Sequence, residues 1–194
     1  MRRLYSAFFM TAAAGLFILA PQKSTFAADN YGVDGVHSSI SFKIQHMGIS
    51  QVHGRFNKFD GTFAIDKADP AKSSFTLTIK ADSVDTGNEG RDKHLRSPDF
   101  FDTKQHADIT FKSTSVKAAR DGYEVEGDLT MHGKTKKTKL VLQGGKEIDF
   151  QGMKKTGFIS DVTIKRSDFG MVDKMPGALG DEVYVSIGLE GAKK

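Results

Sequence analysis

The chain has 194 residues, of which 38% are hydrophobic and 27% are charged, a composition typical of one globular domain with a core. It contains no cysteine, which excludes disulfides, thiolate metal sites, thiol catalysis and lipidation at cysteine. The formal charge of +4 falls to about +1 without residues 1–27, because that stretch holds three basic residues and no acidic one. We therefore expect no nucleic-acid partner.

Residues 1–27 have the layout of a secretory signal peptide. Two arginines are followed by an apolar run over residues 7–20 and by small residues that suit cleavage after Ala27. A membrane-spanning helix needs roughly 20 apolar residues, so an uncleaved anchor is the weaker alternative. The sequence predicts a secreted, periplasmic protein with a signal peptide over residues 1–27 and one domain over residues 28–194.

Beyond the leader, apolar residues recur mostly with a period of two. Ile40, Phe42 and Ile44, for example, alternate with polar neighbours. Successive side chains of a strand point to opposite faces, so each segment has one buried and one solvated face. Eight strands are expected, at about residues 36–46, 50–65, 73–84, 107–117, 122–132, 135–143, 154–166 and 182–190.

Short turns separate most of these segments. Asp121-Gly122 and the link from His132 to Lys134 predict tight hairpins, and consecutive hairpins imply an antiparallel meander. One apolar face on eight strands closes naturally into a barrel, which removes the edge strands. The fold class predicted is all-β, an eight-stranded antiparallel barrel.

Residues 86–98 break the period of two between the third and fourth strands. Thr86 with Glu89 fits a capping box, and Pro98 stops the chain, so a short helix is expected. Two glycines weaken this helix, and a solvated loop is the alternative.

Seven segments, taken in order, carry a family resemblance. They are residues 34–47 (DGVHSSISFKIQHM), 48–61 (GISQVHGRFNKFDG), 85–102 (DTGNEGRDKHLRSPDFFD), 109–111 (ITF), 125–133 (VEGDLTMHG), 166–170 (RSDFG) and 179–183 (LGDEV). Together they resemble the YceI family of secreted lipid-binding barrels over about Asn30 to Glu190. One departure is Ala107, where many relatives carry proline.

The resemblance implies a lipocalin-like barrel in the periplasm with an elongated cavity for a long isoprenoid or quinone-type lipid. It also implies amphiphilic amides and fatty acids as other ligands, and a homodimer as a frequent state. It does not separate storage from transport or stress protection. The period of two alone leaves open whether the barrel is hollow, because an eight-stranded barrel is either filled by its side chains or holds one small ligand.

The inward-facing apolar positions are the expected lining of that cavity. They are Ile40, Phe42, Ile44, Phe56, Phe63, Phe75, Leu77, Ile79, Ile109, Phe111, Val125, Leu129, Leu140, Phe158, Val162, Val185 and Ile187. His46, Arg91 and Arg96 are candidates for contact with a headgroup at the mouth, which we expect near residues 86–101.

Neither catalysis nor a metal site is predicted. No Gly-x-Ser-x-Gly elbow is present, and no two histidines have the helical i, i+4 spacing of a zinc site. The parity of the first hairpin directs His46 inward and His53 outward, so they do not converge. No cofactor other than the bound lipid is expected.

Two alternatives stay open beside the lipid carrier. One is an enzyme that acts on a small lipophilic substrate in the same cavity. The other is a filled barrel with a structural or stress-related role. A basic edge favours a transient contact with a membrane surface, although four lysines on a near-neutral protein are weak evidence; they are Lys134, Lys136, Lys137 and Lys139.

Overall fold

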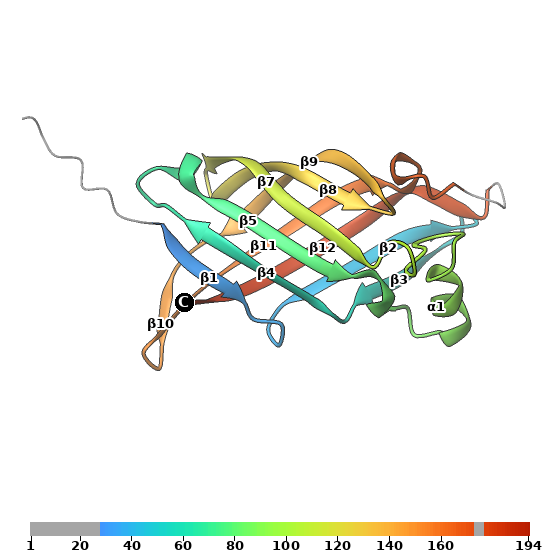
Figure 1. Cartoon of the computed structure of the whole chain (residues 1–194), viewed down its shortest axis with the longest axis horizontal. Coiled ribbons are helices and arrows are strands. Elements are labelled where there is room, and N and C mark those ends of the chain that lie inside the picture. Colours follow the sequence, from blue (N-terminus) through green and yellow to red (C-terminus); the bar gives the residue numbers. More distant parts are fainter. Residues whose placement is uncertain (1–27, 173–176) are drawn as a thin grey trace, which may run out of the picture.

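The computed structural model describes residues 28–172 and 177–194, and its strands form a closed antiparallel barrel (Figure 1). The predicted signal peptide lies outside the described residues. The strands are β1 (Asp29–Val33), β2 (Ser39–His46), β3 (Ser50–Phe56), β4 (Phe59–Ile65), β5 (Ser74–Lys80), β6 (Val84–Asp85), β7 (Asp108–Ala119), β8 (Gly122–Met131), β9 (Lys134–Gly144), β10 (Ile148–Phe150), β11 (Met153–Lys165) and β12 (Leu179–Lys193).

The predicted eight-stranded barrel is confirmed. Three of its eight strands are each interrupted once, so each of them consists of two of the segments named above. β1 and β2 form the first interrupted strand, and both pair with β12. β3 and β4 form the second interrupted strand, and β5 and β6 form the third. β7, β8, β9, β11 and β12 complete the ring, in which β11 pairs with both β9 and β12.

Two of the interruptions lie next to each other and satisfy each other's backbone groups. A 3₁₀ turn, Ala81–Ser83, separates β5 from β6, and Asn57-Lys58 separates β3 from β4. The amide of Asn57 donates to the Ser83 carbonyl at 3.1 Å, and the amide of Lys58 donates to the Ser83 hydroxyl at 3.0 Å. The two kinks therefore bend the barrel wall without leaving backbone donors unpaired.

One short helix, α1 (Glu89–Leu95), lies between the third and fourth strands as predicted, at the end of the barrel opposite β10 (Figure 1). The predicted capping box is wrong. The N-cap is Asn88, whose side chain accepts from the Arg91 amide at 2.9 Å. The amide and hydroxyl of Thr86 both donate to the buried carboxylate of Asp92.

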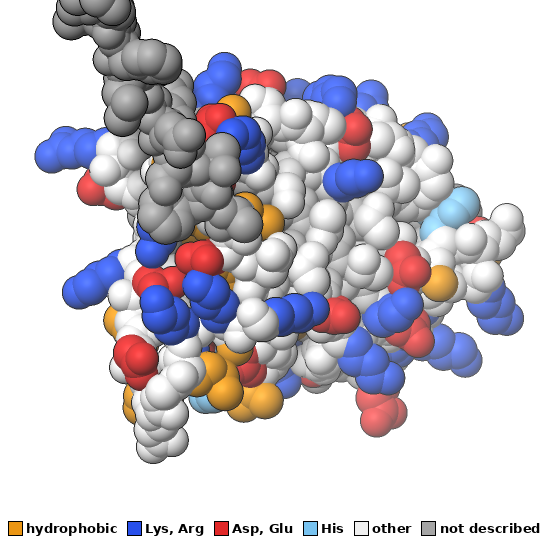
Figure 2. Space-filling model, turned by 60° about the vertical axis from the view of Figure 1, so that its left-hand side comes forward, with side chains coloured by type: hydrophobic (Ala, Val, Ile, Leu, Met, Phe, Trp, Pro, Cys, Tyr) orange, Lys and Arg blue, Asp and Glu red, His pale blue; other side chains and the backbone are white. Residues whose placement is uncertain are grey.

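The barrel interior holds two apolar clusters. The first contains Tyr31, Phe63, Phe75 and Phe158, and the second contains Ile40, Phe56 and Ile109 among others near α1. On the outer surface, acidic and basic side chains are interspersed over the face at the β1 and β10 end (Figure 2). No helix among the described residues is long and apolar enough to cross a membrane.

Candidate functional site

The barrel encloses a cavity of about 110 Å³. Side chains from every strand of the ring line it, and they belong to both apolar clusters. Three threonines also border the cavity. Thr62 and Thr76 alternate with inward-facing neighbours on their strands, whereas Thr138 has the same parity as Leu140 on β9 and faces inward. The hydroxyls of Thr62 and Thr76 hydrogen-bond each other at 2.9 Å, and that of Thr138 donates to a backbone carbonyl. An apolar ligand in the cavity therefore meets hydrocarbon at the wall rather than free polar groups.

Most of the residues predicted to line a cavity are brought together around it. They are Ile40, Phe56, Phe63, Phe75, Leu77, Ile79, Ile109, Phe111, Leu129, Leu140, Val162, Val185 and Ile187. That these side chains contact a ligand stays a prediction.

Four of the predicted lining residues lie elsewhere. Val125 is 0% exposed and packs inside the first cluster, and Phe158 lies edge to face against Phe63 and Phe75 with ring centroids 5.5 Å apart. Phe42 packs over its register partner Gly54, and Ile44 lies further toward the end of β2. Alternation gives the face of a strand correctly, but it does not say how far along the barrel the cavity extends.

The apolar residues that sequence reasoning missed mostly continue the alternation of residues it named. Met131 follows Leu129 by two positions, Leu142 follows Leu140, and the same holds for Ile164 and Leu189. The signal was therefore present in the sequence. Val33 was missed because the first strand begins earlier, at Asp29, than the pattern indicated.

An aromatic cluster closes the barrel at the end away from α1. Tyr31 stacks on Phe63 at 5.1 Å, and Phe63 stacks on Phe75 at 5.9 Å. The Tyr31 hydroxyl donates to Glu147, and burial raises the pKa of the tyrosine above its usual range. The hydrogen bond from Tyr31, with a second from Lys154, lowers the pKa of Glu147 to about 2. Carboxylate and phenol thus fasten the chain between β9 and β10 to β1.

The other end is covered by the segment around α1, and two predicted headgroup ligands hold it in place. Arg96 donates to the backbone carbonyls of Asp82 and Val84, each at 2.7 Å. Arg91 donates to the hydroxyl and carbonyl of Thr86 at 2.7 and 2.8 Å. These bonds brace the loop, so a headgroup contact through either guanidinium stays a prediction.

His46, the third headgroup candidate, lies at the end of β2 opposite Ser50 and Leu179. It is half-buried and does not line the cavity. Its contact with a headgroup also stays a prediction.

The ring is least tightly joined between β9 and β11. Among the described residues this ladder has two registered pairs, Phe158 with Gly144 and Ile159 with Gln143. The ladder between β11 and β12, in contrast, runs without interruption from Lys155 to Lys165. We call the β9–β11 junction the seam. Cavity-lining residues flank it on both sides; they are Leu140 and Leu142 on β9, and Val162 and Ile164 on β11.

Two buried hydroxyls on β11 lack a partner within residues 28–172 and 177–194. Thr156 and Ser160 are each 5% exposed, and the hydroxyl oxygen of neither forms a hydrogen bond. Ser160 lies between Phe158 and Val162 on the strand that forms the seam. An unpaired buried hydroxyl costs about 1–3 kcal/mol.

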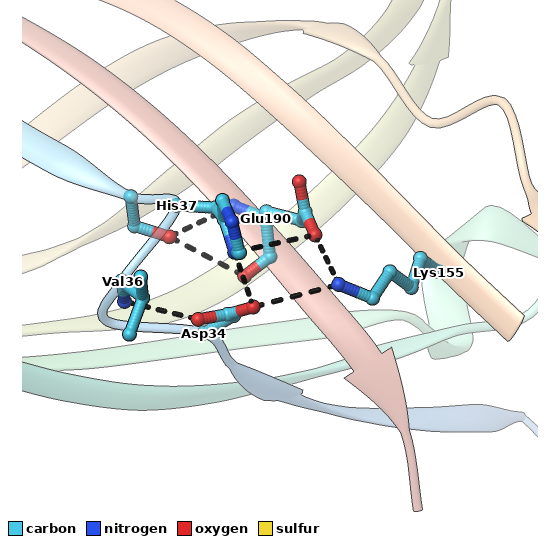
Figure 3. Close-up of polar contacts among 6 residues, drawn as sticks. Asp34, Val36, His37, Lys155 and Glu190 are labelled. Carbon is cyan, nitrogen blue, oxygen red and sulfur yellow. Dashed lines mark hydrogen bonds and ion pairs between the residues drawn. The ribbon is translucent and has the colours of Figure 1, made fainter. Parts of the chain in front are cut away.

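A polar cluster outside the barrel resembles a metal site by composition only. Asp34, His37 and Glu190 have potential ligand atoms within 4.8 Å of one another. However, the Lys155 ammonium lies 2.7 Å from Glu190 and 3.6 Å from Asp34 (Figure 3). A hydrogen bond from His37 lowers the pKa of Asp34 to about 2. Lys155 already supplies the positive charge that a metal would bring.

A closed eight-stranded barrel around an apolar cavity is the architecture of lipocalin-like barrels. The chain belongs to the YceI-like domain family, whose model matches residues 31–191. It is 42% identical to Protein YceI of Escherichia coli over 88% of this chain and 90% of the relative.

Two solved structures share the fold. BcnA of Burkholderia cenocepacia has a TM-score of 0.74 at 26% identity and covers 81% of this chain and 98% of its own. A domain from Saccharophagus degradans, described as polyisoprenoid binding, has a TM-score of 0.63 at 19% identity and covers 84% of this chain and 98% of its own.

Proposed function

We propose that the protein is a non-enzymatic carrier or reservoir that binds a long isoprenoid or quinone-type lipid inside the barrel. The observation that carries this proposal is the chemistry of the cavity wall. Its residues are aliphatic, aromatic, methionine or threonine, and none has a side chain that titrates near neutral pH. Such a wall binds hydrocarbon but supplies no general acid or base, which disfavours an enzyme on a small lipophilic substrate.

Family membership supports the same proposal, and one structural relative is described as binding a polyisoprenoid. The layout of residues 1–27 supports secretion to the periplasm. The basic edge on β9 adds little support for a membrane contact, since three of its four lysines form ion pairs with acidic side chains. Lys139 lies 2.9 Å from Glu124, and Lys137 lies 2.7 Å from Asp128.

The driving force is burial of the lipid's hydrocarbon chain. Each buried CH₂ contributes roughly 0.8 kcal/mol, so a five-carbon unit contributes about 4 kcal/mol before the costs of association are subtracted. A chain of several such units has to pass the barrel wall to reach the cavity, so the proposal needs two wall strands to separate as the chain enters. The seam is the place where two strands can separate with the loss of fewest ladder bonds.

The proposal is tested on protein isolated gently from its own host. Native mass spectrometry followed by solvent extraction should reveal a lipid with a long apolar chain. Leu77→Asp, on the cavity wall, should abolish its retention, whereas Ile49→Asp, at a position 84% exposed between β2 and β3, should not. Circular dichroism checks that both variants fold.

A wild-type protein that carries no lipid from the host would favour the filled barrel. A folded Leu77→Asp protein that retains lipid as well as wild type would show that this wall is not the binding site.

A further inference from the structure

Three metal-ligating side chains from two separate parts of the chain meet at the α1 end of the barrel. Asp102 and His106 belong to the segment between α1 and β7, and His132 belongs to the turn between β8 and β9. One carboxylate oxygen and one nitrogen of each imidazole lie within 4.8 Å of one another. The two imidazole rings are 5.0 Å apart and nearly perpendicular.

The local backbone brings these side chains together. The Asp102 carbonyl accepts from the His106 amide at 2.8 Å, which closes one turn and places both side chains on the same side. Gly133 allows His106 to lie close to the β8–β9 turn, because a Cβ at position 133 would lie 2.7 Å from the His106 ring. Asp102 and His132 have φ values of 43° and 50°, a left-handed conformation that is uncommon outside glycine. Such backbone strain concentrates at functional sites.

His132 is held in the tautomer that a metal requires. Its Nδ1 lies 3.0 Å from the Phe169 carbonyl. A carbonyl only accepts, so Nδ1 carries the proton and Nε2 of the neutral imidazole keeps a free lone pair. Orientation by a backbone carbonyl is the usual second contact of metal-binding histidines.

Asp102 provides the negative charge. The residue is 8% exposed. Throughout residues 28–172 and 177–194, neither a hydrogen bond nor an ion pair reaches its carboxylate. A carboxylate on a residue with so little exposed surface keeps little hydration, and a cation between it and the two imidazoles would compensate its charge. The Asp34 cluster differs in this respect, because Lys155 already lies against its carboxylates.

We propose that Asp102, His106 and His132 bind a divalent transition-metal ion, with Zn²⁺ as the best-matched cation. Two imidazoles and one carboxylate form a common zinc donor set, which leaves a fourth position for water. Bonds of about 2.0–2.2 Å in a tetrahedral site separate the ligand atoms by roughly 3.3 Å, so small side-chain rotations from the observed spacing complete the site. The ion would tie the segment after α1 to the β8–β9 turn.

The test uses protein produced from the whole gene without a polyhistidine tag and treated with a chelator. Isothermal titration with Zn²⁺ near neutral pH should show one equivalent bound. His106→Gln, His132→Asn and Asp102→Asn should each weaken binding at least tenfold, because each removes one ligand. Asparagine tolerates the left-handed backbone at positions 102 and 132. His53→Gln and His37→Gln serve as matched controls and should bind as wild type does.

Two further measurements keep the proposal falsifiable where a variant fails to fold. In the wild type, Zn²⁺ should shift the side-chain nitrogen resonances of His106 and His132 and leave those of His53 unchanged. Binding should also weaken as the pH falls, because protons compete with the metal ion for the imidazole nitrogens. No binding at millimolar Zn²⁺, shifts confined to other histidines, or tenfold weaker binding in the His37 variant would each overturn the proposal.

Discussion

One added methylene on the cavity wall should distinguish a hollow barrel from a filled one. Val162 and Val185 face each other across the β11–β12 ladder, and both line the cavity. Isoleucine keeps the β-branched shape that suits a strand and extends the side chain by one carbon. We expect Val162→Ile and Val185→Ile to stabilise the lipid-free protein and to weaken its retention of lipid.

The magnitude follows from the size of the cavity. At about 24 cal/mol per Å³, a cavity of 110 Å³ lowers the free energy of unfolding by about 2.6 kcal/mol relative to a filled core. Each methylene that fills part of the cavity should raise the free energy of unfolding by roughly 0.8 kcal/mol, and the double variant should raise it by about 1.6 kcal/mol. That gain is smaller than the cost of the whole cavity. Val125→Ile is the matched control. Val125 is 0% exposed and does not border the cavity, so overpacking should destabilise this variant by about 1–3 kcal/mol.

The assay is urea denaturation of delipidated protein, with native mass spectrometry of the same variants isolated from the host. The sign of the stability change decides the question. If Val162→Ile and Val185→Ile destabilise the protein as Val125→Ile does, the wall has no free space and the reasoning from a hollow barrel fails.

Three further predictions concern the seam and the two ends of the barrel. Ser160→Ala should raise stability in urea by about 1 kcal/mol because it removes an unpartnered buried hydroxyl; a loss of stability would show that the hydroxyl has a partner. The lowered pKa of Glu147, about 2 against an ordinary 4.5, gives stability that is complete above pH 4.5 and is lost as the pH falls toward 2. Tyr31→Phe removes the main cause of that shift, so acid unfolding should become less steep in this window, and an unchanged profile would contradict the assignment. Arg96→Ala should speed amide exchange in α1 while the strands keep their protection, since its guanidinium holds the loop; equal protection would show that the bonds to Asp82 and Val84 do not brace it.

The strands could be predicted because their signal is local. A period of two fixes which face of a strand is buried, and eight such segments leave few closed arrangements. The interruption at Asn57-Lys58 could not be predicted in the same way. It depends on hydrogen bonds to Ser83, a residue far along the chain, and nothing in the local pattern encodes that contact.

The same distinction between local patterns and long-range contacts applies to the functional residues. Strand parity placed most lining residues on the inner face, but Phe158 packs into the aromatic cluster and Phe42 over Gly54, because position along the barrel axis depends on strand stagger. The group of Asp102, His106 and His132 lies on turns, where no periodicity applies. Histidine pairs at helical spacing do not mark it, because its i, i+4 pair combines an aspartate with a histidine.

We expect the route into the barrel at the seam rather than near residues 86–101. That segment breaks the strand pattern, which suggested a mouth, yet Arg91 and Arg96 fasten it with charge-assisted hydrogen bonds of 2.7–2.8 Å. The seam has the opposite properties, with a short ladder and cavity-lining side chains on both sides. Separation of β9 from β11 exposes the apolar wall directly and breaks few backbone hydrogen bonds. Opening the barrel at α1, in contrast, must break several strong hydrogen bonds. Lipid loading should therefore change amide exchange at β9 and β11 more than at α1, and the reverse pattern would return the route to the helix.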